Sequence, residues 1–211
     1  ASNAYPKAIA KVSDRPVRQL GSVNLAAAIE GDPSIKSPVR DIIRADVGAF
    51  LQAAAADGAA PIDTLVLGCT HYPLVADEIV ASFDFWRDYA TADGSKPYAK
   101  LVASQLNQVN PAAWTAENLW RSLHATKRMA KAKLVTGDYF YISVPNPDWK
   151  GIGLAPDGSL NYEFKYGRSE GQIDREDTIN LPLRPDMLPG TTAELVRHKL
   201  PLTWQSLQAA R

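Results

Sequence analysis

The chain has 211 residues, 45% of them hydrophobic, which suffices for one large domain or two small ones. Its 23 basic and 23 acidic side chains give a formal net charge of zero, so no overall field attracts it to nucleic acid or to a membrane surface, and small molecules or proteins are the expected partners. A single cysteine excludes an internal disulfide and favours the cytoplasm, and no apolar run reaches the ~20 residues that span a bilayer.

The first part of the chain predicts alternating helix and strand. Residues 17–30 lead from an extended piece into an alanine-rich stretch, and apolar residues recur at helical spacing over 39–51, with Gly58 as a stop signal. The stretch IDTLVLG (62–68) is short and almost continuously apolar, which is typical of a strand covered on both faces. A proline then begins a helix over 73–83. This succession predicts an α/β fold with a parallel sheet and flanking helices.

The remaining elements are predicted from shorter patterns. Residues 85–109 indicate a strand, a turn at Asp93–Ser95 and a helix, and 116–132 indicate a helix with a basic C-terminal half, followed by strand material over 133–144. A change of texture near residue 145 predicts two domains, 1–144 and a C-terminal extension over 145–211. Within the extension, a Pro-Asp-Gly turn precedes alternating apolar and polar residues over 160–166, which predicts a β-hairpin. One late helical patch follows.

The only cysteine lies in the string LVLGCTHYPL, directly after the predicted strand. In an open parallel sheet, ligands bind beyond the carboxyl ends of the strands. The following helix would point its N-terminal dipole at this loop, favouring a bound carboxylate and the thiolate form of Cys69. Thr70 offers a hydroxyl and a backbone N–H, and His71 can hold or relay a proton. On position alone, such a cysteine is more often a small buried hydrophobe than a catalyst.

The string DTLVLGCTHYPL resembles the second-cysteine motif of glutamate racemase, in the aspartate/glutamate racemase superfamily of cofactor-independent enzymes. Upstream, VNLAAAIEGD places Glu30 where the family carries its catalytic glutamate. Downstream, residues 90–106 resemble the strand, acidic turn and helix of the family, and LVTGD (134–138) resembles its closing strand. The resemblance therefore covers about residues 15–140, and residues 145–211 match nothing associated with the family.

The resemblance implies a two-base mechanism, in which one thiolate removes the α-proton of an amino acid and a second thiol returns a proton on the opposite face. Cys69 would serve one face with help from His71, Thr70 would hold the substrate carboxylate, and Glu30 would orient His71 or the substrate ammonium. The expected activity is racemisation of glutamate ahead of aspartate, in the amino-acid metabolism that supplies the cell wall, and a homodimer is implied. No cofactor and no metal are expected, because the sequence has no ligand-spaced cluster and no evident Schiff-base lysine.

The resemblance is confined to the second half of the family. The Asp-Ser-Gly turn, the Pro-Tyr-Gly segment and the Ala-Cys-Asn-Thr string that carries the other cysteine are absent, so the chain alone is expected to be inactive as a racemase. One hypothesis is a C-terminal portion of a longer racemase, completed by a missing N-terminal half or a partner chain, which the tag-like Ser-Asn-Ala start favours. A second is a one-cysteine enzyme that resembles the arylmalonate decarboxylases, where one cysteine protonates a planar intermediate.

A third hypothesis is a racemase-like module that binds or assembles without catalysis. Trp149, Tyr162, Phe164 and Tyr166 would then form a recognition surface, because aromatic residues are enriched at interfaces. The aromatic side of a lone hairpin more often packs onto its own domain. A buried hairpin face would favour packing, and an exposed face would favour the binding module.

Overall fold

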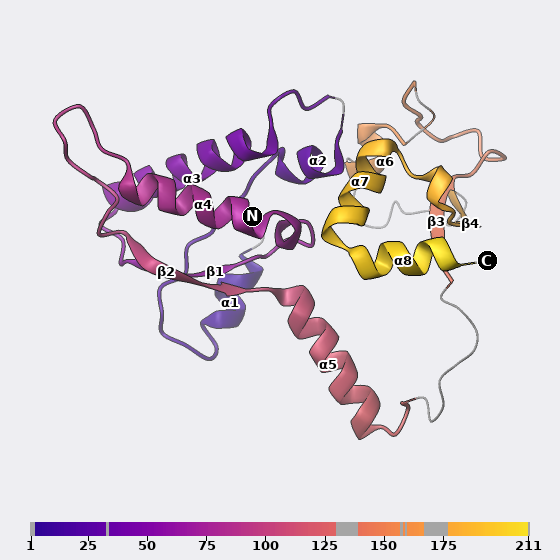
Figure 1. The fold of residues 1–211 in the computed structure, drawn as a ribbon, viewed down its shortest axis with the longest axis horizontal. Helices are drawn as coiled ribbons and strands as arrows, with labels where there is room; N and C mark the ends of the chain where they lie inside the picture. The colour runs from indigo at the N-terminus through magenta and orange to yellow at the C-terminus, as the bar shows by residue number, and fades with distance from the viewer. Residues whose placement is uncertain are drawn as a thin grey trace. The chain divides into compact units, whose positions relative to one another are not determined.

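The structure is a computed structural model that describes residues 3–32, 34–129, 139–156, 158, 160–166 and 177–210. The chain divides into two compact units, residues 1–129 and 130–211, and each is described by itself (Figure 1). The division falls upstream of the predicted boundary between 144 and 145. The string LVTGD at 134–138 lies outside the described residues.

The first unit combines helices with a small parallel sheet. Its elements are α1 (Ala4–Ile9), α2 (Leu25–Glu30), α3 (Val39–Ala56), β1 (Ile62–Val66), the 3-10 turn η1 (Tyr72–Val75), α4 (Ala76–Asp88), β2 (Val102–Val109) and α5 (Pro111–Ala125). Strands β1 and β2 pair in parallel, with Leu65 opposite Gln108 and Val66 opposite Val109. The α/β prediction thus holds in its coarse form, as two parallel strands with helices. The helix predicted over 39–51 and the strand predicted over 62–68 are confirmed.

The core of this unit lies where α3 packs against α4, side by side in Figure 1. Ile43, Val47 and Leu51 form the fully buried face of α3. Phe83 of α4 is also buried, and its ring meets that of Phe50 edge-on at 6.3 Å. Because these positions recur at helical spacing, the amphipathic pattern read from the sequence is the packing surface itself.

Trp86, near the C-terminus of α4, makes a second set of contacts between α4 and α3. Its indole N–H donates to the carbonyl oxygen of Arg44 at 2.8 Å, and its ring contacts Tyr98 edge-on at 5.8 Å. Gly48 faces the same indole, and a Cβ placed there would lie 2.5 Å from the nearest ring atom. Glycine therefore stands in the middle of α3, despite its low helix propensity, because the indole occupies the space of a side chain.

The predicted order over 85–109 is wrong, although its turn is confirmed. Residues 85–88 end α4 instead of forming a strand, because the apolar stripe of that helix continues to Trp86 and Arg87 pairs with Asp84 one turn earlier. The segment predicted to be a helix contains β2, since pairing with β1 overrides its weak helical pattern.

The turn before β2 is built around Asp93. The Thr91 hydroxyl donates to the Asp93 carboxylate at 2.5 Å, and the backbone N–H of Ser95 donates to the same oxygen at 3.0 Å. These hydrogen bonds, with that from Thr91 the strongest, lower the pKa of Asp93 to about 2. Gly94 supplies the positive φ of 82° that the turn requires.

β1 is less covered than its sequence predicts. All but one of its residues are half-buried, and Val66 is 39% exposed. Within the described residues, β1 has one partner strand, β2, and its other side borders a cavity. The prediction of a strand covered on both faces is therefore wrong for this chain as described.

The second unit carries an antiparallel strand pair and short helices. Its elements are β3 (Tyr141–Pro145), α6 (Tyr162–Tyr166), β4 (Thr178–Pro182), the 3-10 turn η2 (Pro185–Met187), α7 (Gly190–Lys199) and α8 (Pro201–Ala209). Ser143 lies opposite Asn180 at the centre of the β3–β4 pair. The late helical patch predicted at the C-terminus is two helices, divided before Pro201.

The hairpin strand predicted over 160–166 is wrong. An antiparallel bridge between Leu154 and Leu160 remains, with Gly158 at a φ of 83° in the turn between them. The side-chain oxygen of Asn161 then accepts from the backbone N–H of Phe164 at 3.0 Å. This is the hydrogen bond of a helix N-cap, so the chain enters α6 where the alternation of apolar residues predicts a strand.

The aromatic residues of this region do not form one strand face. Tyr162 is 71% exposed, whereas Phe164 is half-buried and lies against Gly153, where a Cβ would come within 2.8 Å of its ring. Trp149 belongs to the loop after β3. The comparison of a buried with an exposed hairpin face therefore does not apply to this chain.

Gly48→Ala should destabilise the first unit by about 1–2 kcal/mol, because displacing the Trp86 ring outweighs the ~1 kcal/mol that alanine gains over glycine in a helix. Denaturant unfolding followed by circular dichroism measures the change. Gly21→Ala is the matched control, since no atom lies within 4 Å of the added Cβ, and it should be neutral. Equal stability of the two variants would contradict the packing role of Gly48.

Candidate functional site

The cysteine lies in a tight loop immediately after the parallel strand. The backbone N–H of Leu67 donates to the carbonyl oxygen of Val109 at 3.0 Å, which extends the β1–β2 pairing to the start of the loop. The carbonyl oxygen of Cys69 then accepts from the N–H of Tyr72 at 3.1 Å. These hydrogen bonds hold Cys69 at the carboxyl end of β1, where the sequence predicts it.

The four residues predicted for the site lie together. The imidazole of His71 has its Nδ1 atom 3.6 Å from the Cys69 sulfur and its Nε2 atom 2.8 Å from an oxygen of the Glu30 carboxylate. The Thr70 hydroxyl lies 3.4 Å from the same Nδ1 atom. Glu30 is the last residue of α2, and Gly31 ends that helix with a φ of 78°. Glu30, His71 and Cys69 are referred to below as the triad.

The two ring nitrogens of His71 have different partners, which defines what the triad can do. With the proton on Nε2, the imidazole donates to Glu30 and leaves Nδ1 as an acceptor that faces the thiol. Transfer of the thiol proton to Nδ1 would create a thiolate and an imidazolium, and the Glu30 carboxylate would stabilise that imidazolium. His71 and Glu30 are both partly exposed, by 28% and 35% of their side chains, so the triad is open to solute.

The helix dipole contributes less than the sequence predicts. The helix predicted from residue 73 begins as the 3-10 turn η1, and α4 starts only at Ala76. Asp77 and Glu78 occupy the first turn of α4 and already bring negative charge to its N-terminus. A bound carboxylate would instead meet the loop itself: within the described part of the chain, the backbone N–H groups of residues 69, 70 and 71 donate to no protein acceptor.

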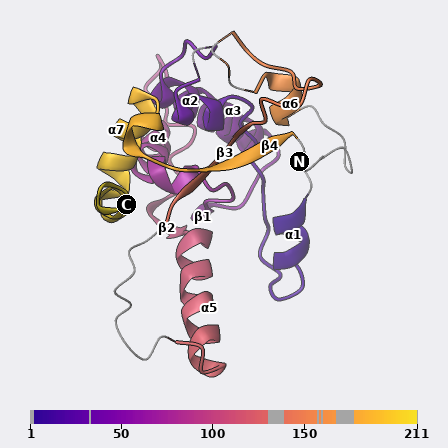
Figure 2. The ribbon, with the colours of Figure 1, turned by 90° about the vertical axis from the view of Figure 1, so that its right-hand side faces the viewer.

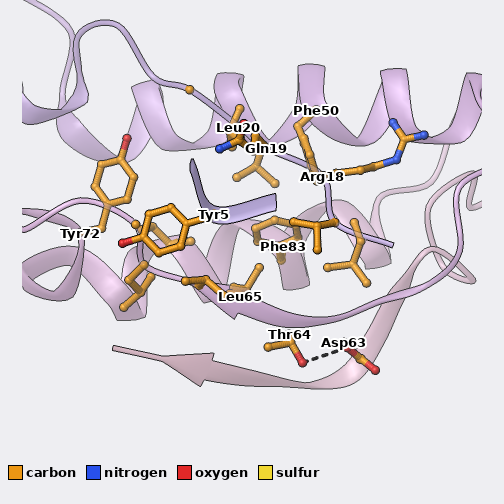
Figure 3. Close-up of a pocket in the computed structure, with 18 of the residues that line it drawn as sticks. Tyr5, Arg18, Gln19, Leu20, Phe50, Asp63, Thr64, Leu65, Tyr72 and Phe83 are labelled. Carbon is orange, nitrogen blue, oxygen red and sulfur yellow. Dashed lines mark hydrogen bonds between the residues drawn. The ribbon is translucent and has the colours of Figure 1, made fainter. Parts of the chain in front are cut away.

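A cavity of about 600 Å³ borders Cys69. It runs between the extended segment 15–22 and the segment 59–69, which contains β1, and it is closed by side chains of α1, α3 and α4 (Figure 3). Cys69 lines this cavity, whereas Glu30, Thr70 and His71 do not. Cys69 therefore belongs both to the triad and to the wall of the cavity.

Most residues that line the cavity are not marked by any motif in the sequence. Tyr72 is within the cysteine string and Asp46 is on the side of α3 that lines the cavity, but no sequence pattern links either residue to a site. The nearly continuous apolarity of β1 was the available signal, because a strand of that composition needs cover that β2 alone does not provide.

Tyr72 is electrostatically coupled to the cysteine. Burial raises the pKa of its hydroxyl above the ordinary value, and negative charge on Cys69 raises it further, while a hydrogen bond with the backbone of Ser22 lowers it. The phenol therefore keeps its proton at neutral pH, and it remains a hydrogen-bond donor at the edge of the cavity.

Comparisons with known proteins gave no match: no protein-family model, no curated protein and no solved structure matches the chain. In the described residues, no group of three or more His, Cys, Asp or Glu side chains is placed to hold a metal ion. No described helix has both the length and the apolarity needed to cross a membrane.

Tyr72→Phe should make the chain less sensitive to alkaline pH. Because the folded-state pKa of Tyr72 is raised, the unfolded chain loses this proton first, so stability is full below pH ~10 and falls as pH rises through the folded-state pKa. Unfolding midpoints between pH 9 and 11.5 should therefore decline less in the variant than in the parent chain. Tyr139→Phe, at an exposed tyrosine, is the control for loss of one hydroxyl. Parallel pH curves for Tyr72→Phe and the parent would contradict the assignment.

Proposed function

We propose that the triad is one acid–base unit of a cofactor-independent amino-acid racemase that acts on glutamate ahead of aspartate. The observation that carries the proposal is the alignment of Glu30, His71 and Cys69, with 2.8 Å from carboxylate to imidazole and 3.6 Å from imidazole to sulfur. A buried structural cysteine needs no such partners, whereas a thiol that exchanges protons does.

The chemical step follows from this geometry. The Cys69 thiolate would take the α-proton, the C–H bond would break, and its electron pair would pass into an enolate-like carboxylate. That developing charge needs hydrogen-bond donors, and the candidates are the Thr70 hydroxyl and the N–H groups of residues 69–71. His71 would accept a proton from the thiol at the start of the cycle. Glu30 would hold the imidazole ring in the orientation that points Nδ1 at the sulfur.

Inversion requires a second acid on the opposite face of the substrate. The 211 residues contain one cysteine, so a second thiol would come from a missing N-terminal half or from a partner chain. Without it, the proton returns to the face it left. The same single thiol is the observation in favour of a second candidate, a decarboxylase-like enzyme in which Cys69 protonates a planar intermediate on one face.

The proposal predicts α-proton exchange that depends on Cys69. The chain is incubated with L-glutamate, and separately with L-aspartate, in deuterated buffer, and the α-proton signal is followed by NMR together with optical rotation. Exchange without inversion is expected from this chain, and Cys69→Ala should reduce it to the background rate. Racemisation should appear when a protein that supplies the second thiol is added. Exchange that persists in Cys69→Ala, or no exchange in the parent chain, would contradict the proposal.

A second experiment tests the triad without substrate. Every alkylation of this chain by iodoacetamide at a thiol reports on Cys69, and the rate near neutral pH follows the thiolate fraction. His71→Asn and Glu30→Gln should slow alkylation by about tenfold, because each removes a group that stabilises the charge-separated pair. His124→Asn and Glu117→Gln, both on the exposed face of α5, are the matched controls. Equal rates in all four variants would show that the triad does not activate the thiol.

A further inference from the structure

We propose that the cavity beside β1 binds a small organic cation with an apolar body, of the arylalkylamine class. Its volume of about 600 Å³ lies within the range of ~300–1,000 Å³ that is usual for small-molecule sites. Its walls are mainly aliphatic and aromatic: Ile43, Val47, Phe50, Leu65 and Phe83. Figure 3 shows Leu65, Phe50 and Phe83 along the middle of the cavity.

The charges around the cavity select for a cation. Two arginines line the wall, and both are already paired: Arg15 with Asp63, and Arg18 with Asp57 at 3.0 Å. An anionic ligand would have to compete with these carboxylates.

Asp46 offers the opposite situation. One of its carboxylate oxygens is buried and has no hydrogen-bond partner among the described residues. A carboxylate that is partly removed from water and has no counter-ion carries a desolvation cost, and the charge of an ammonium group in the cavity would offset part of it. Asp46 is thus the charged wall residue that lacks a counter-ion in the described structure, and its sign is negative.

Two tyrosines complete the cation site. The ring of Tyr5 lies against Gly68, within 3.0 Å of the Cβ that glycine lacks, and Tyr72 lies at the same end of the cavity (Figure 3). Aromatic faces attract ammonium groups, most strongly where water is excluded. Cys69 lines this wall too, so a ligand held there would cover the thiol.

The inference does not depend on the proposed function. Glutamate and aspartate carry a second carboxylate, which the apolar walls and the Asp46 charge both disfavour. The ligand is therefore distinct from the acidic substrate and would act as an effector that controls access to Cys69.

The test compares three probes on the unmodified protein at neutral pH: 2-phenylethylamine, 3-phenylpropionate with a similar body and the opposite charge, and ethylamine without the aromatic body. Calorimetry gives the affinities, and protection of Cys69 from iodoacetamide gives the location. We expect 2-phenylethylamine to protect Cys69 saturably and to bind at least about tenfold more tightly than either other probe. Equal binding of the amine and the carboxylate, or tight binding of the amine with no protection of Cys69, would overturn the proposal.

Variants of α3 test the role of Asp46. Asp46→Asn should reduce the affinity for 2-phenylethylamine by about tenfold, whereas Asp41→Asn, at an exposed acid on the same helix that does not line the cavity, should leave it unchanged. An unchanged affinity in a folded Asp46→Asn protein would overturn the assignment. If that variant does not fold, the comparison of amine with carboxylate on the parent chain still decides the question.

Discussion

The parallel pairing of β1 with β2 is the constraint on which the first unit depends. Two parallel strands that follow one another cannot be joined by a hairpin, so the chain must leave β1 at its carboxyl end and cross back through a helix. That crossover is η1 and α4, and it forces the sharp loop in which Cys69 lies. The position of the thiol is therefore a consequence of the sheet, and the packing of α4 on α3 holds the crossover in place.

The same loop connects two different environments. On one side it meets Glu30 at the end of α2, where a carboxylate and an imidazole form a polar, partly exposed pair. On the other side it borders a cavity with mainly apolar walls. A thiol at such a boundary lies beside groups that can exchange protons with it, while the apolar walls of the cavity reduce its contact with water. This division is the physical basis for treating Cys69 as more than a small core residue.

Local patterns predicted the parts of the fold that local interactions determine. The spacing of Ile43, Val47 and Leu51 was sufficient for α3, and the resemblance to glutamate racemase brought Glu30 into a site with residues 69–71. The failures have long-range or capping causes. The pattern of β2 predicts a helix because its pairing with β1 is not visible in its own sequence. The alternation over 160–166 predicts a strand, but the cap formed by Asn161 outweighs it and α6 forms instead. The cavity could not be foreseen, since it is a gap between segments some forty residues apart.

Helix α5 is stabilised by local interactions more than by burial. Asn110 caps it by accepting from the N–H of Ala112, and Glu117 pairs with Arg121, but α5, whose residues are all described, buries none of them. Figures 1 and 2 show it extending away from the β1–β2 pair. A helix of this length is marginal in water without tertiary packing. The first unit therefore has two levels of stability, and amide hydrogens of α5 should exchange through local fraying long before those of α3, which open only when the core unfolds.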